Sequence, residues 1–348
     1  MPRITPKLVR QARKYNALLP HLLAPCRDLQ SAKNELRWLY DHAVAQTGYR
    51  VCGKPDHRCK SVLRELVLDR AKGTPLQYVM GSQPFYMLDI LCRKGVLIPR
   101  PETESITTFF CKSLSQNHHA EVLNILDICS GTGCIALLMH KLLAPKFRFI
   151  NIQGIDFSSA AVALATQNLL HNSVEVPILD ARARQDIRFI KTDVFNPEDL
   201  DRQVGQIDVL VSNPPYISSQ GFQRVTQKSV RDHEPKAALV PPSRFVGQTD
   251  EDVADSFYPR LLQVAQHKNA RFVLLEVGDL QQAMRVANMA AEQGIWAVCE
   301  IWRDWPEGAP DSNEAAGFGD QVVRVRGTGN GRAVFLQRFV TQASATRH

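Results

Sequence analysis

Asn213, Pro214, Pro215 and Tyr216 follow directly on a short apolar run, residues 207–212. The run is typical of a buried strand in a parallel sheet, and the two prolines force the chain to leave that sheet at Asn213. Open α/β sheets bind ligands at this edge. The Asn213 side-chain carbonyl and the Pro214 backbone carbonyl could accept both hydrogens of a planar –NH2 group, with Tyr216 as a flat neighbour. An ordinary Asn-Pro turn is the alternative.

A glycine turn, residues 127–135 (Asp-Ile-Cys-Ser-Gly-Thr-Gly-Cys-Ile), follows an earlier predicted strand and opens a helix. Such a turn lets the backbone approach a ligand and leaves free N–H groups. The next predicted strand ends at Asp156, about 20 residues beyond Gly133, where a carboxylate can accept both hydroxyls of a ribose. The turn alone does not exclude NAD. The –NH2 clamp downstream favours a methyl donor such as S-adenosylmethionine.

A third predicted strand ends before Asp193, Val194 and Phe195. Asp193 could accept a hydrogen bond from an adenine amine, while the two apolar residues form a slot for the ring. An equally good interpretation is that Asp193 caps the next short helix. The ends of successive strands therefore present a glycine turn, an acidic residue for a ribose, a pocket for adenine and a loop that accepts hydrogen bonds from an –NH2 group.

These residues need a sheet to bring them together, and from residue 121 onward predicted strands alternate with helices. This alternation is the pattern of a doubly wound α/β sheet. The expected strands are 122–129, 149–156, 187–192, 207–212 and 271–277, with 296–301 and 331–339 as a closing antiparallel pair. We expect residues 172–186 and 305–330 to be surface loops.

The chain before this sheet has a different pattern. Residues 1–75 are predicted to be helical, with Ser31 as the cap of one helix and a second helix over 58–72. A hairpin connector should follow, with 85–92 and 95–98 as its strands. The expected divisions are a basic leader 1–30, a helical substrate-docking domain 31–75, a connector 76–105 and a catalytic domain 106–343.

Composition is that of an ordinary globular protein, with 348 residues that are 44% hydrophobic and 22% charged. No apolar run approaches the roughly 18 residues that a membrane span needs. The eight cysteines contain no Cys-x-x-Cys, so we expect neither a metal site nor a disulfide framework.

The positive charge is concentrated at the amino-terminal end. Residues 1–80 hold 15 Lys or Arg and 6 Asp or Glu, and no acid precedes Asp28. One interpretation is a basic surface for an RNA-associated or acidic partner. The other is a mitochondrial transit segment, although the segment is poor in Ser and is interrupted by Pro20 and Pro25.

Several segments resemble the HemK/PrmC-type protein-glutamine N5-methyltransferases, which act on the glutamine of the Gly-Gly-Gln loop in translation release factors. The similar segments are 97–104 (Leu-Ile-Pro-Arg-Pro-Glu-Thr-Glu), 213–217, Glu234-Pro235, 73–78 with Gly81, and 275–278 (Leu-Glu-Val-Gly). The resemblance covers roughly residues 31–340, and the basic leader and long inserts resemble the mitochondrial, fungal branch. It implies a Rossmann-like class I S-adenosylmethionine-dependent methyltransferase sheet with a small helical amino-terminal domain joined by a β-hairpin connector.

The resemblance also implies roles for individual residues. The cofactor would be held by Cys129, Ser130, Gly131, Thr132, Gly133, Asp156, Asp193, Val194 and Asn213. The substrate glutamine would be bound by Asn213, Pro214, Pro215 and Tyr216, of which Asn213, Pro214 and Tyr216 would be catalytic. Cys129-Ser130 departs from the Gly-Thr common in the family, and Val194 stands where a larger aromatic is frequent.

The implied partner is a class I release factor, and neither a membrane nor a direct nucleic-acid substrate is expected. We expect the protein to be a monomer in mitochondria, or otherwise in the cytoplasm. A ribosomal-protein glutamine is an alternative substrate. Adenine-N6 methyltransferases share the Asn-Pro-Pro-Tyr clamp, but they must extrude a base and usually carry a separate recognition domain. A non-catalytic scaffold is disfavoured because the clamp, Asp156 and both glycines are intact.

Overall fold

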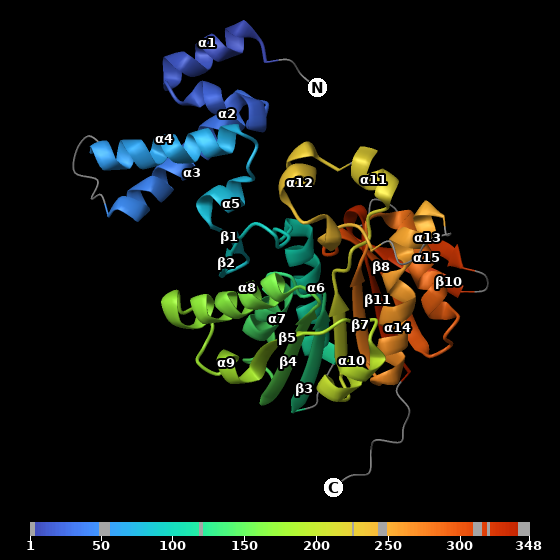
Figure 1. The fold of residues 1–348 in the computed structure, drawn as a ribbon. Helices are drawn as coiled ribbons and strands as arrows, with labels where there is room; N and C mark the ends of the chain where they lie inside the picture. The colour runs from blue at the N-terminus through green and yellow to red at the C-terminus, as the bar shows by residue number, and fades with distance from the viewer. Residues whose placement is uncertain are drawn as a thin grey trace. The chain divides into compact units, whose positions relative to one another are not determined.

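The computed structural model describes residues 4–48, 56–117, 121–224, 226–242, 249–308, 315–318 and 321–339. The chain divides into two compact units (Figure 1). The first comprises Met1–Gln83, Cys92–Lys94 and Gln227–His233, and the second comprises Pro84–Leu91, Gly95–Thr226 and Glu234–His348. No helix in the described ranges combines the length and apolar character needed to cross a membrane.

The first unit is helical, as predicted. Its helices are α1 (Pro6–Tyr15), α2 (Leu19–Cys26), α3 (Leu29–Thr47), α4 (His57–Ala71), α5 (Leu76–Met80) and α12 (Lys228–His233). Asp28, rather than the predicted Ser31, caps α3, since its carboxylate accepts a hydrogen bond from the Ser31 backbone N–H at 2.8 Å. Asp28 has the extended backbone of a cap residue, whereas Ser31 already lies within the first turn.

Helices α1 and α2 belong to the core of this unit. Ala12, Leu19, Leu22 and Leu23 are buried in one cluster with residues of α3 and α4. Arg70 of α4 also forms a two-pronged ion pair with Glu35 of α3, at 2.8 and 3.0 Å. The predicted leader boundary at residue 30 therefore falls within the first turn of α3, a helix that shares one core with α1 and α2.

The second unit contains a nine-stranded sheet among the described residues, in the order β5-β4-β3-β6-β7-β11-β8-β10-β9. The five strands from β5 to β7 are parallel. Strand β11 is antiparallel to both β7 and β8, which confirms the α/β class and the predicted closing pair. The strands are β3 (Val122–Ile128), β4 (Phe149–Asp156), β5 (Ile187–Lys191), β6 (Val209–Ser212), β7 (Phe272–Glu276), β8 (Trp296–Trp305), β9 (Ala315–Phe318), β10 (Gln321–Arg326) and β11 (Thr328–Arg338).

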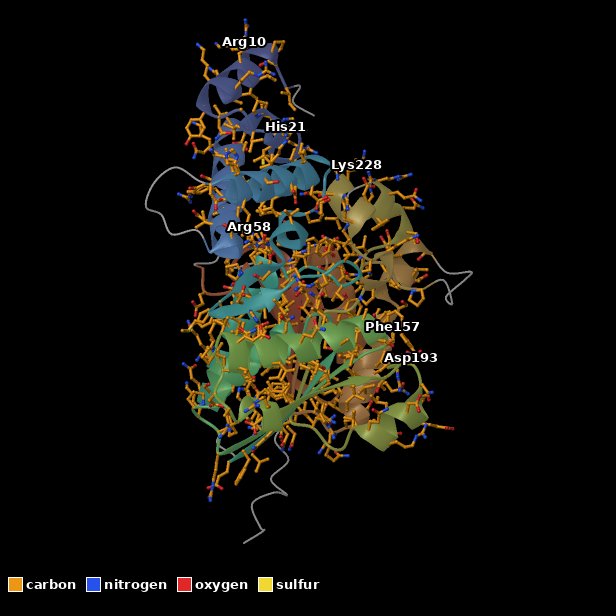
Figure 2. The ribbon with its side chains drawn as sticks, turned by 60° about the vertical axis from the view of Figure 1, so that its left-hand side comes forward. Arg10, His21, Arg58, Phe157, Asp193 and Lys228 are labelled. Atoms are coloured by element: carbon orange, nitrogen blue, oxygen red, sulfur yellow. The ribbon has the colours of Figure 1, made fainter. Side chains whose placement is uncertain are left out.

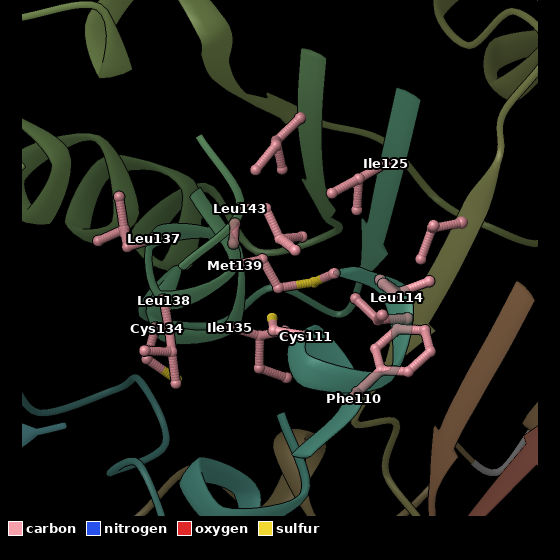
Figure 3. Packing of buried hydrophobic residues seen from close by; sticks show 14 of the residues in the cluster. Phe110, Cys111, Leu114, Ile125, Cys134, Ile135, Leu137, Leu138, Met139 and Leu143 are labelled. Carbon is pink, nitrogen blue, oxygen red and sulfur yellow. The ribbon is translucent and has the colours of Figure 1, made fainter. Parts of the chain in front are cut away.

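Helices cover both faces of this sheet. Residues of α6 (Pro101–Asn117) and α7 (Cys134–Leu143) pack against one face, where Phe110, Leu114 and Ile125 meet α7 (Figure 3). Residues of α14 (Phe257–His267) and α15 (Leu280–Ala291) pack against the other. Alternate β7 residues belong to the two clusters, as a strand buried on both faces requires. The remaining helices are α8 (Ser159–Leu170), η1 (His171–Glu175), α9 (Ala183–Asp186), α10 (Pro197–Gln203), α11 (Ser219–Arg224), η2 (Lys236–Ala238) and α13 (Asp250–Asp255).

The hairpin connector is present, but its strands differ from the prediction. They are β1 (Ser82–Phe85) and β2 (Leu88–Leu91), and residues 95–98 form no strand. Tyr86 adopts a left-handed φ of 55° and reverses the chain with Met87. Both side chains are exposed, so the apolar run over 85–92 contains a turn rather than one continuous strand.

The segment 172–186 is also not the predicted surface loop. The buried side chains of Asn168 and Asn172 bond the backbone of β2 much as a neighbouring strand would. The Asn172 amide accepts from the Asp89 N–H at 3.0 Å and donates to the Asp89 carbonyl at 2.9 Å. Asn168 accepts from the Leu91 N–H at 2.7 Å. Similarly, the predicted loop 305–330 includes β9 and β10.

Candidate active site

The second unit encloses a cavity of about 290 Å³ beside the residues that follow β3, β4, β5 and β6. Parallel strands deliver these residues to one edge of the sheet, as the predicted topology requires. Predicted site residues on its wall are Cys129, Ser130, Gly131, Thr132, Asp156, Asp193, Val194, Asn213 and Pro215. Gly133, Pro214 and Tyr216 are not among the residues that line it.

In the glycine turn, every second residue from 129 to 133 has a left-handed backbone conformation. Cys129, Gly131 and Gly133 have φ angles of 63°, 54° and 78°. A left-handed conformation costs a non-glycine residue roughly 1–2 kcal/mol, so Cys129 holds a strained backbone. A Cβ on Gly133 would lie 2.7 Å from the Phe189 ring, whereas a Cβ on Gly131 would meet nothing within 4 Å. Gly133 thus serves packing, and Gly131 keeps the cavity wall open.

Asp156 links the ends of β3 and β4. Its carboxylate accepts hydrogen bonds from the backbone N–H groups of Gly131 at 3.0 Å and Ser158 at 2.9 Å. Burial raises the pKa of this carboxyl, while these N–H groups oppose the rise. Each carboxylate oxygen keeps further acceptor capacity, which suits the two hydroxyls of a ribose.

The residues after β5 form an apolar part of the wall. The Asp193 carboxylate accepts from the Phe195 N–H at 3.0 Å. Asn196 caps α10, so the interpretation of Asp193 as the helix cap is wrong. Val194 is buried, and the Phe195 ring packs edge-on against Phe257 at 4.9 Å.

Two hydroxyls on the wall fit the polar groups of a bound nucleoside. Ser130 Oγ and Thr192 Oγ1 are buried and have no hydrogen-bond partner within the described part of the chain. Buried polar groups are normally paired, so two unpaired hydroxyls on residues of the cavity wall are open to a polar partner. With Asp156 and the apolar slot, they fit S-adenosylmethionine.

Asn213 is held by residues outside the predicted site. Its amide Nδ2 lies 3.4 Å from Thr103 Oγ1, and the Thr103 hydroxyl donates to Glu276 Oε2 at 2.8 Å. The Tyr216 hydroxyl lies 3.3 Å from Glu276 Oε1. Burial raises the pKa of Glu276 to about 7, although hydrogen bonds from Thr103 and Tyr216 and the nearby Arg332 oppose the rise.

The carboxylate of Glu234 connects two of the family segments that are far apart in the sequence. Buried Glu234 accepts from the Ile98 N–H at 3.0 Å and from Arg100 Nη2 at 2.8 Å. Ile98, Arg100 and Thr103 themselves line the cavity. Segments 97–104 and 234–235 are therefore parts of one wall, and segment 275–278 joins it through the hydrogen bond between Thr103 and Glu276. Their motifs were visible in the sequence, but no residue-level signal assigned a role to Thr103, Glu234 or Glu276.

The sheet has antiparallel β11 inserted beside β7. At one edge it presents a glycine turn, an acidic residue suited to a ribose and an Asn-Pro-Pro loop. This combination defines a class I S-adenosylmethionine-dependent methyltransferase. The Methyltransferase small domain family matches residues 95–238.

Curated relatives narrow the class. The mitochondrial MRF1 N(5)-glutamine methyltransferase MTQ1 of Saccharomyces cerevisiae is 36% identical over 86% of this chain and 84% of that protein. The probable MRF1 mitochondrial N(5)-glutamine methyltransferase mtq1 of Schizosaccharomyces pombe is 32% identical over 83% of this chain and 89% of that protein. The release factor glutamine methyltransferase of Haemophilus influenzae is 30% identical over 82% of this chain and 92% of that protein. This chain belongs to the release factor glutamine methyltransferase family.

Proposed function

We propose that this protein transfers a methyl group from S-adenosylmethionine to the side-chain amide nitrogen (N5) of the glutamine in the Gly-Gly-Gln loop of a mitochondrial peptide chain release factor. The observation that carries the proposal is Asn213 on the cavity wall, with its Nδ2 directed to Thr103. This orientation leaves Oδ1 to accept a hydrogen bond from a substrate amide. The relatives in two fungi, both named for MRF1, support the choice of partner and compartment.

The chemistry asks the protein mainly for positioning. An amide nitrogen is a poor nucleophile because its lone pair is conjugated with the carbonyl, as the roughly 18–20 kcal/mol barrier to amide rotation reflects. Asn213 Oδ1 and the Pro214 carbonyl would accept both amide hydrogens and stabilise positive charge that develops on the nitrogen. Fixing the amide in line could contribute about 7–11 kcal/mol.

When bound, S-adenosylmethionine supplies the methyl group and the sulfonium leaving group. Asp156 would hold its ribose, Asp193 and Val194 its adenine, and the turn from Cys129 to Gly133 its methionine part. The amide nitrogen would form one N–C bond as the S–CH3 bond breaks with its electron pair left on sulfur, and the nitrogen would afterwards lose one proton to water. No general base is needed in the loop.

The helical unit is the proposed docking domain for the release factor, and the protein is proposed to act as a monomer. Lys7, Arg10, Arg13 and Lys14 are exposed on α1, and Arg10 points outward from it (Figure 2). α1 contains no acidic residue. Because α1 also contributes to the core through Ala12, we propose that its positive charge serves a partner that works on the ribosome.

The test is methyl transfer to a panel of acceptors. Purified protein is incubated with methyl-labelled S-adenosylmethionine and a mitochondrial release factor, a ribosomal protein or an adenine-containing oligonucleotide. We expect label on the release factor alone, and none with Asn213→Ala. Asn151→Ala, at an exposed position of β4, is the matched control and should retain full activity. Label on the ribosomal protein or the oligonucleotide instead would overturn the proposal.

A further inference from the structure

A chain of buried hydrogen bonds stands behind Asn213. Thr103 lies in the first turn of α6, Asn213 and Tyr216 follow β6, and Glu276 ends β7. Thr103 and Glu276 are only 2% and 3% exposed. The contacts run from Asn213 Nδ2 to Thr103 Oγ1 at 3.4 Å and from the Thr103 hydroxyl to Glu276 Oε2 at 2.8 Å. Three separate elements thus meet behind one amide.

The direction of these hydrogen bonds follows from the carboxylate. An ionised carboxylate can only accept, so the single Thr103 hydroxyl hydrogen is committed to Glu276. Thr103 Oγ1 can then offer only lone pairs to Asn213. The Asn213 amide must therefore turn its NH2 toward Thr103 and its Oδ1 away from it.

The orientation matters because an asparagine amide has one accepting and one donating end. With Oδ1 toward the substrate, Asn213 can accept a hydrogen bond from an incoming –NH2 group. With the amide flipped, two NH2 groups would face each other, and Oδ1 would face the lone pairs of Thr103. A flipped clamp would repel the group that it is meant to hold.

We propose that Glu276 and Thr103 are positioning residues that set the hydrogen-bond polarity of Asn213, so that the clamp accepts from the substrate amide. The proposal rests on the proposed function, since it concerns the same clamp. Tyr216 contributes by donating to the second oxygen of Glu276, at 3.3 Å. The ionised form of Glu276 accepts from both hydroxyls and has no hydrogen of its own to donate.

The polarity should depend on pH because burial raises the pKa of Glu276 to about 7. The groups that act on this carboxyl come from every element around it: Glu102 and Thr103 of α6, Cys134 of α7, Tyr216 after β6, Tyr258 of α14 and Arg332 of β11. When Glu276 is protonated, it can donate to Thr103. The Thr103 hydroxyl is then free to donate to Asn213, and the flipped amide becomes allowed.

The alternative is that these residues only tie α6 to β7. Thr103→Val removes the hydroxyl at nearly constant shape, Thr103→Ser keeps it, and Glu276→Gln replaces the carboxylate with a group that fits either polarity. In the wild type, kcat should fall as pH drops through about 7. Thr103→Val should lose about 100-fold in kcat, the loss expected when a reacting group is misplaced. The kcat of this variant should also lose its pH dependence near 7, because no hydrogen bond then connects Glu276 to Asn213 through residue 103.

Glu276→Gln should also lose that pH dependence, with a smaller loss of kcat, while Thr103→Ser should restore both rate and pH profile. Affinity for S-adenosylhomocysteine should stay within about 3-fold in all three variants, since the Thr103 variants nearly keep the shape of the cavity wall and Glu276 does not line the cavity. A Thr103→Val enzyme with the wild-type rate or the wild-type pH profile overturns the inference. So does equal impairment of the Ser and Val variants.

The failure of the proposed function gives a different result. Wild-type protein that methylates no release factor refutes that function, and the same three variants are then measured on whichever panel member accepts the methyl group. A wild type active on the release factor, with variants that keep its pH profile, refutes only the polarity argument. A wild type that labels no member of the panel refutes both.

Discussion

Replacing Gly133 with alanine tests why the turn after β3 contains two glycines. The new Cβ would lie 2.7 Å from the Phe189 ring and 3.0 Å from the Ala165 Cβ. The left-handed φ of 78° adds strain that glycine avoids. Backbone strain of roughly 1–2 kcal/mol and overpacking of about 1–3 kcal/mol should together lower the free energy of unfolding by about 2–5 kcal/mol.

Gly131→Ala is the matched control, because its φ of 54° is also left-handed but its Cβ would meet nothing within 4 Å. Its free energy of unfolding should fall by only about 1–2 kcal/mol. Urea-induced unfolding followed by circular dichroism measures both variants, and the loss of unfolded-chain entropy on replacing Gly by Ala largely cancels between them. Phe189→Leu should recover part of the Gly133→Ala loss. Equal destabilisation by the two alanines would refute the close approach to Phe189.

Three further predictions concern the cofactor, the connector and the partner. Asp156→Ala should weaken S-adenosylhomocysteine binding about 10- to 100-fold by calorimetry, the equivalent of losing charged hydrogen bonds worth about 1.5–3 kcal/mol, and unchanged affinity would refute the ribose assignment. Hydrogen bonds to Glu175 and Asp89 outweigh desolvation and raise the pKa of His171, so its stabilising contribution should be complete below its unfolded pKa and lost as pH rises through its folded pKa. His171→Gln should flatten that part of the stability–pH curve, whereas His21→Gln, at an exposed position, should leave it unchanged. Arg10→Ala should raise KM for the release factor more at low salt than at high salt while kcat stays constant, and an unchanged KM at low salt would move the docking surface elsewhere.

The parallel strands and the site at their carboxyl ends were predictable because long apolar runs alternate with helical patterns. Strand β4 has the predicted bounds, 149–156, and Asp156 ends it on the cavity wall. Strong local patterns and the topology of a parallel sheet were enough to bring Asp156, Gly131 and Asn213 together.

The errors have local physical causes. A continuous apolar run over 85–92 conceals a turn at Tyr86, because exposed apolar residues in a turn look like a strand in the sequence. Asn168 and Asn172 gave no periodic signal, yet their amides act as a substitute strand for β2. Nothing in the local sequence indicated that Gly133 approaches the Phe189 ring closely.

The support behind the clamp was beyond prediction for a different reason. Thr103 and Glu276 are about 170 residues apart in the sequence and act through one hydrogen bond of 2.8 Å. Their segments were recognisable as family motifs, but only the fold shows that they meet. The role that we propose for Thr103 and Glu276 depends on the direction of their hydrogen bonds as well as on their residue types.

The most direct test of the central claim is tandem mass spectrometry of the release factor after reaction with S-adenosylmethionine. We expect one added methyl group on the side-chain nitrogen of the glutamine in the Gly-Gly-Gln loop with wild-type protein, and none with Asn213→Ala. An unmodified loop, or a methyl group on any other residue of the release factor, would contradict the account.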